Sequence, residues 1–410
     1  MLFRWRGALK QPFDKIKVLD LSWAGVGPII TAILAEHGAT VIRVESIKRP
    51  GPDRTLAPYK DFKPGINRSG YVALYNSNKY SLALDLNHPR ALETIKKFVK
   101  KVDIVAEAFA PGFLESKDLN YKELKKVKHN IILFHTSMQG HTGPHAHARG
   151  LGFILTSLSG ITNITGWPDR PPSSPLGPYT DYLAPWIGAT VLLSALDYRD
   201  RTGKGVEIDH SQLESVMHYL TPSLLEYQLT GKAQRMGNRS DQAAPHGVYP
   251  CKGEDRWCAI GVTSEEQWKA FCDVTGNMDW IRDNRFATFV NRKVNEDELD
   301  KLIAAWTINL TPQEVILKLQ SKGIAAGVVQ IADEILSCPQ LEARESWWMT
   351  SVMEIGTFPV PGKPYCLSRT PVLRKWGTPC LGEHTEFVCK KVFRMSNKEF
   401  DKLLVEGLFE

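Results

Sequence analysis

The sequence lacks long hydrophobic runs, which argues against a helical membrane protein. No stretch approaches the roughly 20 consecutive apolar residues that a membrane-spanning helix requires. The first residues, 1–10, include basic side chains but no apolar segment of about 7–15 residues behind them, so we expect no secretory signal. These absences predict a cytoplasmic protein without a membrane partner.

Paired cysteines and metal-binding clusters are also missing. The seven cysteines are odd in number and contain no CxxC pair, which is typical of reduced thiols rather than of a disulfide framework. Cys251 and Cys258 have no second pair that would complete a metal site. The densest group of possible ligands consists of His135, His141, His145 and His147. No Asp, Glu or Cys lies among them, so we expect solvated loop histidines and no metal.

Charge of one sign is modest. The 51 Lys and Arg against 45 Asp and Glu leave a net charge of +6, which suits a ligand carrying phosphates but is far from a nucleic-acid-binding footprint. The lysines at 96–101 and 125–128 lie on expected helices, where a solvated face explains them. With 43% hydrophobic residues, a chain of 410 residues has enough apolar content for one large or two medium globular domains.

What the sequence does contain is an alternation of strand and helix patterns, which predicts an α/β fold with a parallel sheet. The expected strands are 17–22, 40–45, 82–86, 103–109, 131–137 and 206–209. The expected helices are 27–37, 89–101, 119–129, 183–198, 211–229 and, near the end of the chain, 397–406. Residues 139–180 are rich in Gly, Pro and His and are expected to be loops. The stretch 237–253 is expected to be a linker to a smaller domain.

Two glycine motifs suggest nucleotide binding but are incomplete. Gly25–Gly27 follow the first strand, and Glu45 lies about twenty residues further on, as in a dinucleotide-binding unit. Ile30 takes the place of the third glycine, and Pro28 removes an N–H that would face a pyrophosphate. We therefore expect a tight strand-to-helix turn, another ligand in the same crevice, and no NAD. Residues 202–205 (TGKG) lack the Ser/Thr and the glycine-rich run of a phosphate loop, so we expect a turn.

Asp181 is the candidate catalytic residue. It lies between a Pro- and Gly-containing loop and a long apolar helix. An aspartate in this place also suits a helix N-cap. The two roles are compatible, because a carboxylate near a helix N-terminus stays ionised and an ionised carboxylate can act as a nucleophile.

Eleven motifs in order make the chain resemble the family III CoA-transferases, the group of formyl-CoA and carnitine-CoA transferases. They are VLDLSWAGVGP (18–28), GATVIRVE (38–45), NSNKYSLALDL (76–86), DIVAEAFAPG (103–112), GHTGP (140–144), SLSGITNITG (157–166), YTDY (179–182), RTGKG (201–205), APHGVYP (244–250), AAGVVQIADEILSCPQLEARE (325–345) and LGEHTE (381–386). The resemblance covers nearly the whole chain, and its specificity comes from the order of the motifs.

The resemblance implies a large Rossmann-like domain built from both chain ends, a smaller α+β domain, and an interlocked, ring-like dimer. On this basis residues 1–225 form the N-terminal part of the large domain, 226–335 the linker and small domain, and 336–410 the return to the large domain. The dimer is either a homodimer or a heteromer with a related chain. The implied ligands are acyl-CoA and a carboxylic acid, with no nucleic acid, metal or NAD.

The implied activity is CoA transfer from a donor acyl-CoA to a carboxylic acid. The family's catalytic aspartate falls on Asp181, which would form an aspartyl anhydride and then an aspartyl-CoA thioester. Such intermediates require a site that excludes water and N–H groups that stabilise each oxyanion. The loops at 237–253 are candidates to supply those N–H groups.

The implied CoA contacts fall on sixteen residues: Gly25, Val26, Ser46, Leu84, Asp85, Leu86, Asn87, Ala108, Phe109, Ala110, Ser116, Lys117, Arg149, Gly150, Leu151 and Gly152. Gly25, Ser46 and Ser116 depart from the formyl-CoA transferases, which have a glutamine and two arginines at these positions. Nearby cations, Lys48, Lys117 and Arg149, are candidates to compensate.

Two other functions belong to the same superfamily. Acyl-CoA racemases carry a His-Asp pair where this chain has Leu151 and Gly152, and a racemase needs an acid and a base. A non-catalytic partner subunit would lack the aspartate that is present at 181. The segments GWPDRPP, YTDYLAPW and APHGVYPCKGEDRWC resemble transferases of anaerobic aromatic degradation, such as succinyl-CoA:benzylsuccinate CoA-transferase. This resemblance implies succinyl-CoA as donor and an aromatic acid such as benzylsuccinate as acceptor.

Overall fold

The computed structural model describes residues 10–410, which divide into two compact units. The larger unit comprises the chain up to 162 together with 174–232 and 343–410, and the smaller unit comprises 163–173 and 233–342. The expected boundaries at 225 and 335 each lie seven residues before these limits of 232 and 342. The sequence patterns did not indicate that 163–173 belongs to the smaller unit.

The larger unit is built on a six-stranded, all-parallel sheet with the strand order β3-β2-β1-β4-β5-β6. Its strands are β1 (Lys17–Leu21), β2 (Thr40–Glu45), β3 (Lys79–Ala83), β4 (Ile104–Glu107), β5 (Ile132–Ser137) and β6 (Glu207–Ser211). The central strands read as apolar runs because helices cover both faces of a parallel sheet. This strand order is that of a Rossmann fold.

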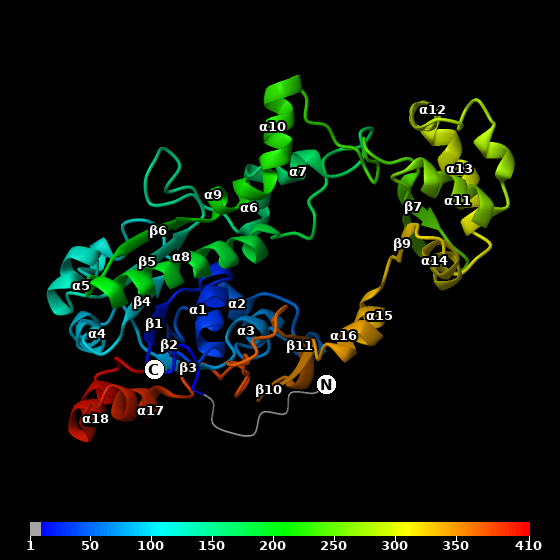
Figure 1. The fold of residues 1–410 in the computed structure, drawn as a ribbon. Helices are drawn as coiled ribbons and strands as arrows, with labels where there is room; N and C mark the ends of the chain where they lie inside the picture. Colours follow the sequence, from blue (N-terminus) through cyan, green and yellow to red (C-terminus); the bar gives the residue numbers. More distant parts are fainter. Residues whose placement is uncertain (1–9) are drawn as a thin grey trace. The chain divides into compact units, whose positions relative to one another are not determined.

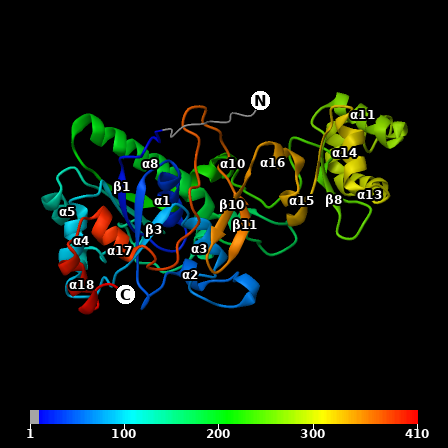
Figure 2. The ribbon, with the colours of Figure 1, turned by 90° about the horizontal axis from the view of Figure 1, so that it is seen from below.

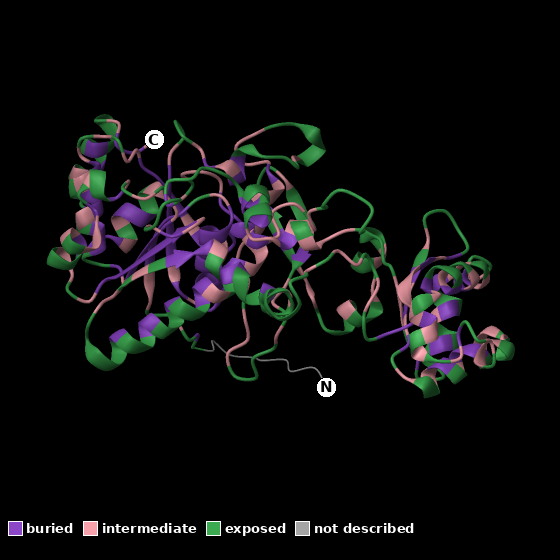
Figure 3. Cartoon of the chain, turned by 90° about the horizontal axis from the view of Figure 1, so that it is seen from above, coloured by how far each residue is buried: buried purple, intermediate pink, exposed green. Residues whose placement is uncertain are grey.

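Two layers of helices cover the sheet, and a separate hydrophobic core lies under each (Figure 1). On one face α1 (Val26–Glu36) and α8 (Thr180–Thr202) pack on residues such as Val18 and Phe134. On the other face α4 (Ala91–Val99), α5 (Tyr121–Val127) and α18 (Asn397–Val405) pack on residues such as Leu19 and Leu133. Figure 3 shows the buried residues concentrated in this sheet and the helix faces against it.

The final segment of the chain returns to the larger unit and closes one end of it. A hairpin of β10 (Trp347–Val352) and β11 (Gly356–Pro361) lies beside the short helices α2 (Pro52–Thr55) and α3 (Gly70–Tyr75), as Figure 2 shows. Asn67 and Arg68, between those helices, donate hydrogen bonds to Glu354 in the hairpin turn. Further along, the chain forms α17 (Thr385–Phe387) and α18, so both ends of the sequence build this unit.

The smaller unit has its own three-stranded sheet and its own core. The strands are β7 (His246–Pro250), β8 (Trp257–Gly261) and β9 (Ala325–Val328), paired antiparallel. The helices are α11 (Glu265–Thr275), α12 (Phe289–Val294), α13 (Glu296–Thr307), α14 (Pro312–Gln320) and α15 (Ala332–Leu336), and the chain leaves the unit in α16 (Pro339–Ala343). Trp268, Phe271 and Phe286 are the largest apolar side chains of its core.

Several elements differ from the sequence expectations. The helix expected at 211–229 is divided into α9 (Gln212–Met217), a 3-10 turn at His218–Leu220 and α10 (Thr221–Thr230), which begins beside Pro222. The loop region 139–180 contains α6 (Gly152–Leu158) and α7 (Ile161–Ile164). Within residues 10–410 no helix combines the length and the apolar character that crossing a membrane requires.

Candidate active site

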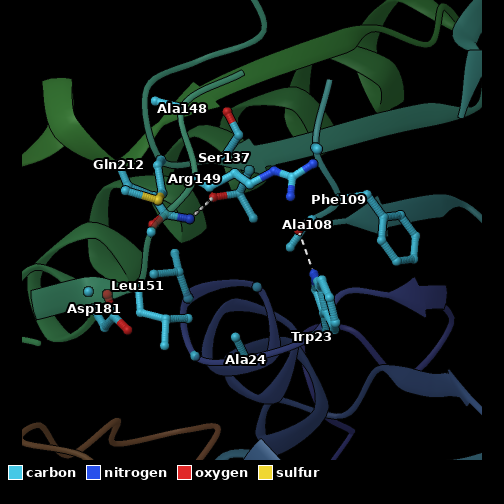
Figure 4. A pocket seen from close by; sticks show the side chains of 18 of the residues that line it. Trp23, Ala24, Ala108, Phe109, Ser137, Ala148, Arg149, Leu151, Asp181 and Gln212 are labelled. Atoms are coloured by element: carbon cyan, nitrogen blue, oxygen red, sulfur yellow. Dashed lines mark hydrogen bonds between the residues drawn. The ribbon is translucent and has the colours of Figure 1, made fainter. Parts of the chain in front are cut away.

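A cavity of about 420 Å³ opens in the larger unit where strands β1, β4 and β5 end (Figure 4). The strand order reverses between β1 and β4, and ligands of open α/β sheets bind in the crevice at such a switch point. The turn Trp23–Gly27 after β1 forms one wall, and the segment 108–111 after β4 forms another. The Trp23 indole donates a hydrogen bond of 2.8 Å to the Ala108 carbonyl, which ties these two walls together.

Asp181 lies on the wall of this cavity, in the first turn of α8. The N-cap role expected for it is wrong, because α8 begins at Thr180 and its N-cap residue is Tyr179. The Asp181 carboxylate caps no backbone N–H there and receives one hydrogen bond, of 3.4 Å, from the Thr180 hydroxyl. Within residues 10–410 it forms no ion pair. The carboxylate is therefore available to a molecule in the cavity.

Two glycines leave the space that the Asp181 carboxylate occupies. A Cβ atom on Gly152 would lie 2.3 Å from one carboxylate oxygen, and a Cβ atom on Gly25 would lie 3.1 Å from the other. Any larger residue at position 152 would collide with the carboxylate in this orientation. The same position cannot hold the base of a racemase without moving Asp181.

Burial also sets the protonation of this group. Burial raises the pKa of the Asp181 carboxyl to about 6, while the hydrogen bond from Thr180 lowers it. The usual effect of a helix N-terminus, which keeps a carboxylate ionised, is outweighed here by removal from water. At pH 7 about nine-tenths of the carboxyl remains ionised with such a pKa. The group is thus an anion that water solvates poorly, as a carboxylate nucleophile requires.

The expected CoA contacts line three cavities of the larger unit. Nine of them line the cavity of Asp181: Gly25, Val26, Ala108, Phe109, Ala110, Arg149, Gly150, Leu151 and Gly152. A second cavity of about 300 Å³ is lined by Ser46, Leu84, Asp85, Leu86 and Asn87, and also by Phe109 and Ala110. Ser116 and Lys117 line a third, of about 190 Å³, together with Leu86 and Asn87. Shared lining residues make the three cavities neighbours.

The three cations expected to compensate for missing arginines differ in their contacts. Lys48 pairs with Asp85 at 3.0 Å and with Glu410 at 3.4 Å, and Lys117 donates to the Asn87 amide at 2.9 Å. Arg149 makes no ion pair or side-chain hydrogen bond within residues 10–410. Figure 4 shows its side chain at the cavity between Ser137 and Ala108. Arg149 is therefore the cation of these three that is free to bind an anionic ligand.

Other residues of the cavity were not recognised in the sequence. Five of them are Trp23, Thr136, Ser137, Met138 and Gln212. Each follows or ends a strand of the sheet, so the rule that ligands bind at the carboxyl ends of parallel strands was the signal that could have found them. Thr136 and Ser137 end β5, and Gln212 directly follows β6.

The histidine cluster and Glu45 have structural partners. His135 is buried rather than solvated, and its Nδ1 lies 2.5 Å from Glu107, whose carboxylate also lies 3.6 Å from His141. Burial lowers the pKa of His135, but the hydrogen bonds and charges of Glu107 and Glu207 together outweigh burial and raise it. Glu107, His135 and His141 each place one possible metal-ligand atom within 4.8 Å of the others, so the fold brings to the histidines a carboxylate that the sequence did not place among them. Glu45 is buried and pairs with Arg54 at 2.6 Å, so it is not presented to a ribose.

Comparison with known proteins gives a consistent result. The sequence model of a family described as CoA-transferase family III matches residues 13–385. The succinyl-CoA–D-citramalate CoA-transferase of Chloroflexus aurantiacus is 34% identical over 375 residues, which cover 91% of this chain and 92% of that protein. The succinyl-CoA:glutarate CoA-transferase of Mus musculus is 28% identical over 405 residues, covering 98% and 91%. A crystal structure of a CAIB/BAIF family protein from Brucella suis superimposes with a TM-score of 0.85 at 27% identity, covering 93% and 99%.

Proposed function

The chain belongs to CoA-transferase family III, and we propose that it moves CoA from a donor acyl-CoA, with succinyl-CoA favoured, to a carboxylic acid through Asp181. The observation that carries this proposal is the Asp181 carboxylate itself. It lies on the cavity wall, pairs with no cation among residues 10–410 and is flanked by Gly25 and Gly152. A carboxylate in that setting has the freedom to form and break bonds that a paired carboxylate lacks.

The proposed reaction begins when an Asp181 oxygen attacks the thioester carbonyl. The C–S bond breaks and leaves an acyl–aspartyl anhydride and CoA thiolate. The thiolate then attacks the aspartyl carbonyl, which releases the donor acid as its carboxylate and forms an aspartyl-CoA thioester. The acceptor carboxylate displaces the thiolate and forms a second anhydride. Attack of the thiolate on the acceptor carbonyl yields the new acyl-CoA and free Asp181, so the thioester energy is conserved without ATP.

Each tetrahedral step places negative charge on an oxygen beside Asp181. The N–H groups of Val26 and Gly27, in the first turn of α1, have no acceptor within that helix, and both residues line the cavity. We propose them as oxyanion donors, supported by the positive N-terminal end of the helix dipole. The loops at 237–253 remain predicted donors and belong to the smaller unit.

We propose a dicarboxylic acid as the acceptor. The relatives named above include enzymes for D-citramalate and glutarate, and another relative is a succinyl-CoA–L-malate CoA-transferase subunit of Chloroflexus aurantiacus. Benzylsuccinate, the acceptor suggested by the sequence motifs, is also a dicarboxylic acid and carries an aromatic substituent. The free Arg149 guanidinium is a suitable partner for an anionic group of either CoA or the acid.

The two alternative functions receive less support. In the position of the racemase His-Asp pair the cavity presents Leu151 and Gly152, neither of which can transfer a proton. A non-catalytic subunit would not need an exposed path to a carboxylate like that of Asp181. We therefore propose transferase chemistry in this chain itself.

We further propose that the chain works as an interlocked dimer, homomeric or with a related chain. Helix α10 carries three leucines and a tyrosine, yet none of its residues is buried, and Leu229 is 84% exposed. Large exposed apolar groups on α6 and α8, such as Phe153 and Trp186, belong to the same unit. Apolar surface of this extent is typical of an interface. Light scattering of the purified chain should give the mass of a dimer if the assembly is homomeric. A stable monomer would contradict the homodimer, and a monomer that also forms no complex with a related chain would contradict the proposal.

The proposed function is tested by CoA exchange followed by mass spectrometry. The purified chain is mixed with succinyl-CoA and, in turn, D-citramalate, L-malate, glutarate and benzylsuccinate, with Asp181→Ala and Asp181→Asn beside it. We expect a new acyl-CoA from the unaltered chain and none from either variant. Trapping with hydroxylamine should label Asp181 alone during turnover. Equal product from the variants would rule out Asp181 as the nucleophile.

A further inference from the structure

A network of buried hydrogen bonds connects Gln212, on the cavity wall, to the interior of the larger unit. The Gln212 amide nitrogen lies 3.3 Å from the Thr136 hydroxyl, which lies 2.9 Å from His210 Nδ1. His210 Nε2 lies 2.8 Å from the Ser215 hydroxyl. All four residues are buried. Thr136 and His210 are register partners on the adjacent strands β5 and β6, so the sheet itself fixes the positions of these two members of the network.

The direction of every hydrogen bond in this network follows from its buried end at Ser215. Ser215 donates its single hydroxyl proton to the Ser211 carbonyl at 2.9 Å, because a carbonyl can only accept. The Ser215 oxygen must then accept from His210 Nε2–H. Burial lowers the pKa of His210 to about 4, so the ring is neutral at pH 7 and its Nδ1 is an acceptor.

The direction of the hydrogen bonds at the Gln212 end of the network is determined in the same way. Thr136 donates its proton to His210 Nδ1, so its oxygen can only accept from Gln212. The Gln212 amide group is therefore oriented with nitrogen toward Thr136, as the dashed line in Figure 4 indicates. One N–H of Gln212 is used in this bond. The second N–H and the carbonyl oxygen remain for a molecule in the cavity.

From this orientation we infer that Gln212 binds an amide of the pantetheine arm of CoA, and that Thr136 is the positioning residue that presents it. The inference rests on the proposed function, since it takes CoA to occupy this cavity. A secondary amide carries an N–H donor and a carbonyl acceptor, which match the two groups that Gln212 leaves unpaired. The pantetheine arm contains two such amides.

The position of Gln212 agrees with the path that the arm must take. The thioester has to reach Asp181, and Gln212 lines the same cavity as Asp181. Phe109 and Ala110 line both this cavity and the second one, where Ser46 and Asp85 lie. An arm that enters past Phe109 and Ala110 therefore passes through the cavity of Gln212 before it reaches the nucleophile.

Calorimetry with two ligands tests the inference without requiring turnover. CoA carries the pantetheine arm, whereas adenosine 3′,5′-bisphosphate contains the nucleotide part alone. For Gln212→Leu we expect the Kd for CoA to rise about tenfold, the effect of one or two lost hydrogen bonds. The Kd for adenosine 3′,5′-bisphosphate should stay within about twofold, a tolerance smaller than the loss of one good hydrogen bond.

Thr136 variants separate positioning from simple packing. Thr136→Val removes the acceptor for Gln212 and should weaken CoA binding about threefold to fivefold, whereas Thr136→Ser keeps the hydroxyl and should bind as the unaltered chain does. The double variant Gln212→Leu/Thr136→Val should bind CoA no more weakly than Gln212→Leu alone, because Thr136 acts through Gln212.

The outcomes decide between distinct explanations. If Gln212→Leu leaves the CoA affinity unchanged, or weakens both ligands equally, the inference is wrong. Additive losses in the double variant would overturn the positioning role of Thr136. If the unaltered chain binds neither ligand, the proposed function itself fails, which is a separate result.

Discussion

Replacing Asp181 by Asn should make the protein more stable above pH 6 while abolishing its activity. Burial raises the pKa of Asp181 from 3.8 to about 6, so the folded state disfavours the charged form by about two pKa units. At 1.36 kcal/mol per unit the ceiling is about 3 kcal/mol, and partial exposure with solvent screening reduces the expected gain to about 1.5 kcal/mol. Asn has nearly the same shape and carries no charge.

The sign of the effect depends on pH. The folded pKa lies above the unfolded one, so the neutral carboxyl is fully compatible with folding below about pH 4, and the penalty grows as pH rises to 6. Parallel urea denaturation of the two proteins should therefore show equal stability near pH 4 and a more stable variant at pH 8. Asp169→Asn, which changes an exposed aspartate, should show no such pH-dependent difference. An equal gain at both pH values, or no gain at pH 8, would refute this reasoning.

Three further predictions concern activity and stability. The kcat/KM for succinyl-CoA should fall about tenfold for each pH unit below 6, because only ionised Asp181 attacks, and a flat profile down to pH 5 would contradict this. Gly152→Ala should lower kcat about 100-fold or more because its Cβ would lie 2.3 Å from an Asp181 oxygen, whereas Gly327→Ala, with no atom within 4 Å of its Cβ, should leave kcat unchanged. Arg54→Ala should cost about 3 kcal/mol of unfolding free energy in denaturant titrations, because it removes the buried partner 2.6 Å from Glu45. Arg43 remains 3.0 Å from Glu45, so we expect a cost at the lower end of the range for breaking a buried ion pair. A cost below about 1 kcal/mol would show that Arg54 is dispensable.

The strands that were predicted correctly are those whose signal is local. Runs rich in Val, Leu and Ile placed β1 and β2 almost to the residue, because strands covered on both faces need mostly apolar side chains. The strand expected at 82–86 lies instead at Lys79–Ala83. Lys79 does not read as a strand residue, yet it is fully buried and pairs with Asp20 at 3.0 Å. That pairing joins two segments far apart in the sequence, so no local pattern could indicate it.

Prolines explain two differences between the expected and the observed elements. Pro222 divides the helix expected at 211–229, since a proline supplies no N–H and suits only a first turn. In the last segment, the hairpin of β10 and β11 was not predicted, because its sequence contains prolines, which are uncommon in strands. A two-stranded sheet consists of edge strands alone, and an edge strand tolerates proline where its N–H would face solvent.

For Asp181, local sequence predicted the role of the residue, whereas tertiary contacts set its pKa. Asp181 was predicted as the nucleophile from its place before an apolar helix and from the family resemblance. Its raised pKa was not predicted, because the local environment of a helix start favours the ionised form. Burial against Gly25 and Gly152 reverses this preference, and only folding brings those two glycines to the carboxylate.

The sequence by itself determined the α/β class and the family, and it predicted Asp181 as the nucleophile together with nine other residues that line the same cavity, because apolar periodicity and ordered motifs are local properties of the chain. Tertiary structure alone decided which of these residues meet. The strand order places the cavity between β1 and β4, and the register of β5 and β6 orients Gln212 through Thr136 and His210. These arrangements depend on contacts between distant segments, and the burial that shifts the pKa of Asp181 exists only once those contacts form.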